Sequence, residues 1–97
     1  MIEHIVLIRW TEGASEDAKD SAMTELRNLK DKVPGIVELS SGVNFSERAK
    51  GYTHGLVFRF KDRAAVEAYL AHPEHVRVVQ KFLNPFRSDT LVFDYEF

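Results

Sequence analysis

Three side chains that can exchange protons lie close together in the second half of the chain: Tyr69, His72 and His75. They stand where one predicted helix ends and another begins, because Pro73 stops the first helix and suits the first turn of the second. A neutral imidazole can accept a proton near neutral pH, and a phenol can donate a hydrogen bond to an oxyanion that forms during a reaction. This segment is therefore a candidate acid–base site.

Two further histidines, His4 and His54, lie in apolar, alternating stretches that are typical of strands. Strands from distant parts of a sequence can face one interior, so we expect all four histidines to converge. Structural roles are the alternatives: hydrogen-bonded core residues for His4 and His54, a helix cap for His72, and packing at the helix junction for Tyr69 and His75. A zinc site made from the histidines is a weaker alternative, because no cysteine or carboxylate stands at ligand spacing.

The composition indicates one globular domain, residues 1–97, with 44% hydrophobic residues and a net charge of −2. Acidic and basic residues are mixed without a long run of one sign, which argues against nucleic acid or an anionic membrane as a partner. The chain has no cysteine, so disulfides, thiolate nucleophiles and cysteine metal sites are excluded. The first apolar stretch lacks the features of a signal peptide, and we expect a cytoplasmic protein.

The hydrophobic periodicity predicts the element order β-α-β-β-α-β. The strands are expected over 2–10, 36–44 with a bulge or bend at 40–42, 52–60 and 90–97, and the helices over 15–33, 63–71 and 73–83. In the second helix Val66, Tyr69 and Leu70 are expected to face inward. In the short helix after it, Val76, Val79, Phe82 and Leu83 are expected to form the apolar side.

This order predicts an α+β, ferredoxin-like sandwich, in which a four-stranded antiparallel sheet carries helices on one face. The strands have apolar side chains on both faces, and the chain holds seven Phe, three Tyr and one Trp. We therefore expect a homodimer in which a second copy covers the bare face and the two sheets close into a barrel. Val6 and Phe58 are expected to lie on the shared face.

Five spaced motifs resemble the stress-responsive dimeric α/β-barrel (Dabb) family over nearly the whole chain. They are His4-Ile5-Val6-Leu7, Pro34-Gly35-Ile36, Gly51-Tyr52-Thr53-His54-Gly55, Tyr69-x-x-His72-Pro73-x-His75 and Phe93-Asp94-Tyr95. The resemblance implies the same barrel-forming dimer, with a small-molecule pocket in each protomer.

The site residues are similar to those of one plant member of this family, the polyketide cyclase olivetolic acid cyclase. The resemblance implies that His75 is a catalytic base and Tyr69 an oxyanion donor, while His4, His54 and His72 border the substrate. The reaction implied is a cofactor-free, aldol-type cyclisation of a hydrophobic polyketide or β-dicarbonyl compound.

Some relatives bind magnesium through backbone carbonyls, which correspond here to those of Lys30, Val33 and Ile36. Apart from this structural ion, no cofactor is expected. The resemblance leaves open whether the chain is an enzyme, because the family mixes enzymes with other proteins. The alternatives are a non-enzymatic stress-response or structural dimer and, at the level of architecture only, a monooxygenase-like dimeric α/β-barrel enzyme.

Overall fold

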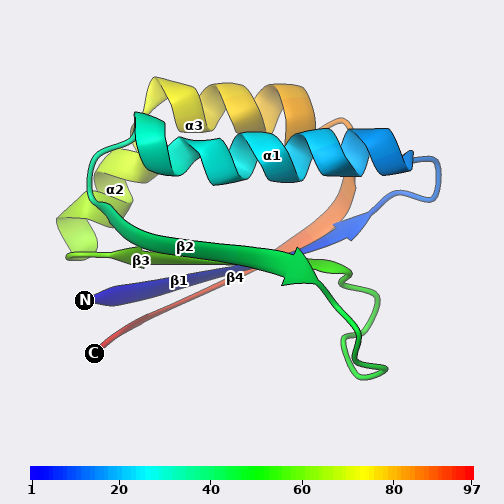
Figure 1. The fold of residues 1–97 in the computed structure, drawn as a ribbon, viewed down its shortest axis with the longest axis horizontal. Helices are drawn as coiled ribbons and strands as arrows, with labels where there is room; N and C mark the ends of the chain where they lie inside the picture. Colours follow the sequence, from blue (N-terminus) through cyan, green and yellow to red (C-terminus); the bar gives the residue numbers. More distant parts are fainter.

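The computed structural model describes all 97 residues as a four-stranded sheet with every helix on one face (Figure 1). The sheet is antiparallel throughout, in the order β2-β3-β1-β4. Its strands are β1 (Ile2–Trp10), β2 (Ile36–Val43), β3 (His54–Phe60) and β4 (Arg87–Glu96), and its helices are α1 (Glu16–Lys32), α2 (Arg63–Ala71), α3 (Pro73–Val78) and the π-helical turn η1 (Val79–Leu83). The predicted element order and ferredoxin-like fold are confirmed.

Helix α1 begins and ends where its sequence dictates. The Ser15 hydroxyl caps the helix by accepting a hydrogen bond from the Ala18 N–H. A proline and a glycine end it, and Gly35 has a φ of +96°, a conformation that favours glycine. α1 buries one apolar stripe against the sheet, made of Ala22, Met23, Leu26 and Leu29. No helix of the structure is both long enough and apolar enough to cross a lipid bilayer.

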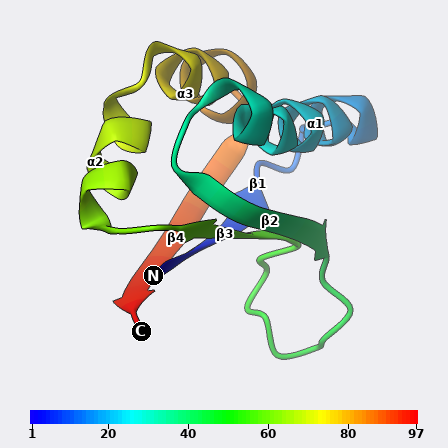
Figure 2. The same ribbon diagram turned by 60° about the vertical axis from the view of Figure 1, so that its left-hand side comes forward.

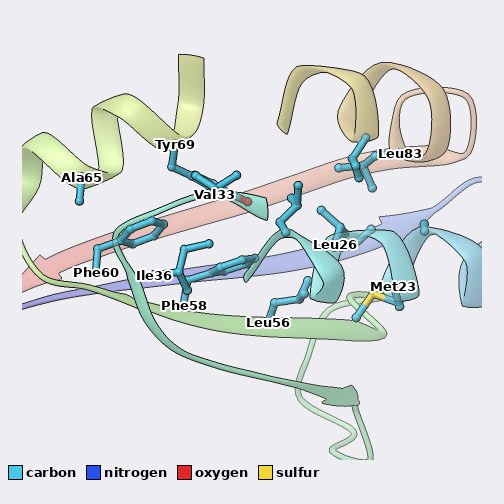
Figure 3. Close-up of a cluster of buried hydrophobic side chains, with 14 of the residues drawn as sticks. Met23, Leu26, Val33, Ile36, Leu56, Phe58, Phe60, Ala65, Tyr69 and Leu83 are labelled. Carbon is cyan, nitrogen blue, oxygen red and sulfur yellow. The ribbon is translucent and has the colours of Figure 1, made fainter. Parts of the chain in front are cut away.

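The core lies between the helices and the sheet, and aromatic rings dominate one end of it (Figure 3). Phe58 and Phe60 of β3 lie under Tyr69 of α2, with ring centroids 5.4 and 5.1 Å from that of the tyrosine. Leucines and methionine fill the other end, under α1. The aromatic end of the core therefore supports the segment that carries the candidate site.

The bulge in β2 lies at Val37, and the bulge predicted over 40–42 is absent. Ile36 pairs with Phe60 and Leu39 pairs with Phe58, so three residues of β2 oppose two of β3. The extra residue lets both Ile36 and Leu39 point toward the helices, where both contact the core. Pairing over 40–42 is regular, so packing of the core and not the Ser-Ser-Gly sequence fixes the bulge.

The inward faces of the later helices differ from the prediction at two positions. In α2, Ala65 and Tyr69 are buried, whereas Leu70 is exposed. After Pro73, Val78 is fully buried and Val76 is exposed. The π-helical turn after Val78 changes the helical phase, so Val76 and the residues from Val79 onward do not share one 3.6-residue pattern.

The sheet face away from the helices is uncovered in the single chain (Figure 2). Val6 and Phe58 do not lie on it, contrary to the prediction: both contact the helix-side core. Ile5 pairs with Val57 and Phe93, and all three point to the bare face. Every second residue from them along each strand points to the same face. The apolar residues of the bare face are Ile5, Leu7, Val57, Leu91, Phe93 and Tyr95.

Candidate functional site

The junction between α2 and α3 places Tyr69 and His75 side by side. His72 ends α2 through its backbone N–H, which donates to the Tyr69 carbonyl at 3.1 Å. The same residue begins α3, because its Nδ1 accepts a hydrogen bond from the Glu74 N–H at 3.1 Å. Pro73 occupies the first position of α3. The resulting sharp turn brings the ring centroid of His75 to 4.4 Å from that of Tyr69.

His75 is held as a neutral base. Its Nδ1 lies 3.2 Å from the Leu70 carbonyl oxygen, and since a carbonyl only accepts, Nδ1 carries the proton. The lone pair is therefore on Nε2. Burial lowers the pKa of His75, and the neighbouring His4 and His72 lower it further, while the bond to Leu70 opposes this shift. At neutral pH the ring can thus accept a proton at Nε2.

Tyr69 is held as a hydrogen-bond donor. The residue is 2% exposed, and burial raises the pKa of its hydroxyl far above the ordinary value of tyrosine, so it stays protonated. No protein group forms a hydrogen bond with this hydroxyl. Every polar side-chain atom that is fully enclosed in the molecule does have a hydrogen-bond partner, so the hydroxyl is not fully enclosed. The hydroxyl therefore touches accessible space, where it is free to donate to a ligand.

His4 completes the cluster with a carboxylate that the sequence did not reveal. His4 is buried and lies opposite Asp94 in the β1–β4 register, with its Nδ1 2.5 Å from Asp94 Oδ1. The carboxylate accepts a hydrogen bond from Nδ1–H, which leaves Nε2 free. The His4 ring lies edge-on to Tyr69 at 6.0 Å between centroids. The sequence held one clue to Asp94. Strand alternation places this acid on the helix-facing side of β4, where a charged residue is unusual.

The cluster reaches the surface through Asp94. Its side chain is 43% exposed and borders an open hollow of about 350 Å³ between α2 and β4, which Ile2, Arg63 and Val66 also line. Neither Tyr69 nor His75 lines this hollow or any of the other four principal hollows. Access to the cluster in the single chain is therefore narrow.

His54 lies away from the other three histidines, so the predicted convergence of all four is wrong. It pairs with Ile8, four residues along β1 from His4, which is about 13 Å in a strand. Its Nδ1 accepts from the Trp10 Nε1–H at 2.9 Å, with the Thr53 hydroxyl at 2.8 Å. The proton of the neutral ring is thus on Nε2, and burial lowers the pKa of His54. His54 borders two open hollows near the end of β2.

The structure bears on two predicted metal sites, the histidine zinc site and the magnesium site at the end of α1. No group of three or more His, Asp or Glu side chains is placed to share a metal ion, which overturns the histidine zinc alternative. The carbonyl predicted for magnesium at Lys30 lies in the last turn of α1, and it has no intrahelical partner because the residue four positions later is Pro34. Val33 caps the helix, and Ile36 begins β2 after the turn. Carbonyl oxygens are ligands that a hard cation accepts, and magnesium binding at these residues stays a prediction.

Comparison with known proteins places these features in a family. The model of the stress responsive A/B barrel domain matches residues 2–97. Two similar proteins come from Arabidopsis thaliana, and both are described as stress-response A/B barrel domain-containing proteins. One is 30% identical over 98% of this chain and 36% of its own length, and the other, HS1, is 28% identical over 98% of this chain and 88% of its own length. This chain thus spans about a third of the first relative and most of the second.

Two solved structures show the fold of such relatives. A dimeric ferredoxin-like protein of unknown function from Jannaschia sp. CCS1 has a TM-score of 0.83 at 30% identity and covers 99% of this chain and 98% of its own. A hydroxynitrile lyase from Passiflora edulis has a TM-score of 0.88 at 23% identity and covers 97% of this chain and 90% of its own. The first shows that a neighbour on this fold is dimeric, and the second shows a shared fold.

Proposed function

Since this chain belongs to the stress-responsive A/B barrel domain family, we propose that it is a cytoplasmic homodimer with an acid–base site for a small carbonyl compound in each protomer. One observation carries this proposal: a protonated, unpartnered Tyr69 hydroxyl lies beside His75, whose free Nε2 is basic at neutral pH. Dimeric neighbours on the same fold support the homodimer.

The chemistry follows from the protonation states. Nε2 of His75 removes a proton from a carbon between two carbonyls, and the electron pair moves to one carbonyl oxygen to give an enolate. The Tyr69 hydroxyl donates a hydrogen bond to that oxygen. The enolate carbon then attacks a further carbonyl, farther along the same molecule, forming a carbon–carbon bond, and the new alkoxide takes the proton back from His75. Protons and electrons balance within the substrate and His75.

His4 has a supporting role in this proposal. Asp94 holds the His4 ring in one orientation next to Tyr69 and His75. His72 is engaged as a helix cap, and His54 lies too far along the sheet to share the reaction.

The substrate class is a hydrophobic polyketide or β-dicarbonyl compound. We base this proposal on the resemblance between the site residues predicted from the sequence and those of the plant cyclase. The hydroxynitrile lyase on this fold supports the idea that the architecture can carry a lyase.

Deuterium exchange tests the proton-abstraction step without knowledge of the natural substrate. β-Keto esters of increasing chain length are incubated in D₂O, and loss of the central proton signal is followed by NMR. We expect exchange above background with the wild type, none with His75→Ala, and a rate about 10²–10³-fold lower at most with Tyr69→Phe. His54→Ala is the matched control and should retain the rate. Undiminished exchange in His75→Ala would rule out the base.

A second candidate function is a non-enzymatic stress-response or structural dimer. The narrow access to Tyr69 and His75 favours it, because none of the principal hollows is lined by either residue. The same exchange assay separates the two: a stable dimer that accelerates exchange of no β-keto ester supports the structural role.

Magnesium at the end of α1 is part of the proposal. The Pro34→Ala variant restores an N–H that can bond to the Lys30 carbonyl and so competes with the ion. We expect MgCl₂ to raise the Tm of the wild type relative to NaCl of equal ionic strength, with a smaller rise in Pro34→Ala. Equal Tm values for the wild type in both salts would contradict the site.

A further inference from the structure

Arg27 on α1 is a cation that no carboxylate of the chain neutralises. Its guanidinium donates instead to two hydroxyl oxygens, from Nη2 to Thr24 Oγ1 at 3.2 Å and from Nη1 to Ser41 Oγ at 3.4 Å. The arginines that do pair with Asp or Glu side chains are Arg9, Arg59, Arg63 and Arg77. Hydroxyl groups orient a guanidinium without cancelling its charge, so the charge of Arg27 is available to an anion.

Arg27 borders a hollow on the helix side of the sheet. α1 lies over β2 (Figure 1), and the open hollow between them has a volume of about 310 Å³. Arg27 and Ser41 line it with polar groups. Val43 and the buried Met23, which lies at the end of the core under α1 (Figure 3), line it with apolar groups. A charged group beside apolar side chains suits a small organic anion.

His54 directs a second hydrogen-bond donor to the same hollow. Its Nδ1 accepts from the Trp10 indole N–H at 2.9 Å, so in the neutral ring Nε2 carries the proton. No group of the chain bonds to Nε2, and since every enclosed polar side-chain atom has a partner, this N–H is not enclosed. The ring lies on the helix-facing side of β3, opposite Val43, which is the side of the hollow. Nε2–H is therefore placed to donate to a ligand there.

Asp20 limits the charge that such a ligand can carry. It borders the same hollow and lies two helical turns, about 10 Å, before Arg27 on α1. Burial and the charge of Lys19 lower the pKa of His54, whereas the charges of Glu16 and Asp20 raise it, so Asp20 lies toward the His54 end. A dicarboxylate would bring its second negative charge toward Asp20, whereas a monocarboxylate would not.

We propose that this hollow binds a small monocarboxylate that also carries a carbonyl group. The carboxylate lies on the free N–H groups of Arg27, whose planar fork matches two carboxylate oxygens, and the carbonyl oxygen accepts from Nε2–H of His54. The carbon chain of the ligand packs against Met23 and Val43.

The site is separate from the pair of Tyr69 and His75. His54 lies about 13 Å along the sheet from His4, which contacts that pair, and neither Tyr69 nor His75 lines the hollow. Binding here is thus independent of the acid–base reaction proposed above, and its test needs no turnover.

A titration with 4-oxopentanoate, followed by ¹H–¹⁵N NMR at neutral pH and constant ionic strength, tests the site. We expect saturable shifts of the backbone amides of residues 20–27, 41–43 and 54, and a Kd about tenfold or more higher in Arg27→Gln. Arg48→Gln is the matched control, because Arg48 also has no carboxylate partner but lies between β2 and β3, outside the hollow, and it should leave the Kd unchanged. Shifts that do not saturate, or an unchanged Kd in Arg27→Gln, would overturn the inference.

Two related acids test the other contacts. Pentanoate lacks the carbonyl and should bind more weakly than 4-oxopentanoate, and equal Kd values would overturn the contact with His54. Succinate carries a second charge and should also bind more weakly, with part of its affinity restored in Asp20→Asn. A succinate Kd that is the same in the wild type and in Asp20→Asn would overturn the preference for a monocarboxylate.

Discussion

Each of three histidine rings is held in one tautomer by its neighbours, and the tautomer decides what the ring can do. His75 donates a hydrogen bond from Nδ1–H to a carbonyl and keeps a basic Nε2. His4 donates a hydrogen bond from Nδ1–H to Asp94. His54 accepts from Trp10 at Nδ1, so its Nε2 is a donor. Three residues of one type, which look equivalent in the sequence, therefore have different roles.

Substitution of Asp94 should weaken both the fold and the site. Asp94→Asn removes the charge from the bond to the buried His4, and we expect a loss of roughly 1–3 kcal/mol in the free energy of unfolding, measured by urea denaturation. Asp89→Asn makes the same chemical change on the same strand, but at a partly exposed pair, and should cost less. Equal losses in the two variants would contradict a special role for Asp94.

At the scale of elements, the turn between α1 and β2 shows how one residue joins two layers. Gly35 has a φ of +96°, and a Cβ placed there would lie 2.9 Å from the Ala65 Cβ on α2. Gly35→Ala should therefore destabilise the protein by about 1–3 kcal/mol, because it adds backbone strain and a clash. Gly13→Ala is the matched control, since its Cβ would meet nothing within 4 Å. Thermal denaturation of both variants compares them, and a Gly35→Ala protein as stable as the control would contradict this reading.

The elements could be predicted from the sequence where local signals decide them. Ser15 and Asp62, whose residue types favour the N-cap position, cap α1 and α2, and Pro73 begins a helix as expected. The bulge at Val37 could not be predicted, because it depends on two nonadjacent residues both reaching the core.

In the candidate site too, some features could be predicted from the sequence and others depend on contacts between distant residues. Residue type and strand alternation were enough to predict that Tyr69, His75 and His4 lie close together, and their rings do. The position of His54 could not be predicted, because alternation gives the face of a strand residue and only the register gives its place along the sheet. Asp94 was missed because an acid in an alternating strand ordinarily points to solvent.

For the whole molecule, charges placed on the two faces of the sheet should have different effects. Phe58 lies in the core on the helix side, so its substitution tests folding, whereas Phe93 lies on the bare face, so its substitution tests association. Phe58→Asp places a charge in the core between sheet and helices, so we expect an unfolded or insoluble chain. Phe93→Asp places a charge on the bare face, where the single chain tolerates it, and we expect a folded monomer. Circular dichroism reports the fold, and light scattering after size exclusion reports the mass. A Phe93→Asp protein that remains dimeric would show that the bare face is not the interface.

The central claim is that neutral His75 acts as the base beside Tyr69, and the pH dependence of proton exchange tests it most directly. Burial lowers the pKa of His75, so its basic form persists below the ordinary histidine value of about 6.5 and is lost as the pH falls through the lowered pKa. Tyr69 stays protonated throughout this range. We predict that the acidic fall of the exchange rate occurs below pH ~6.5 and coincides with the His75 midpoint measured by NMR titration. A rate that does not change as His75 titrates would contradict the account.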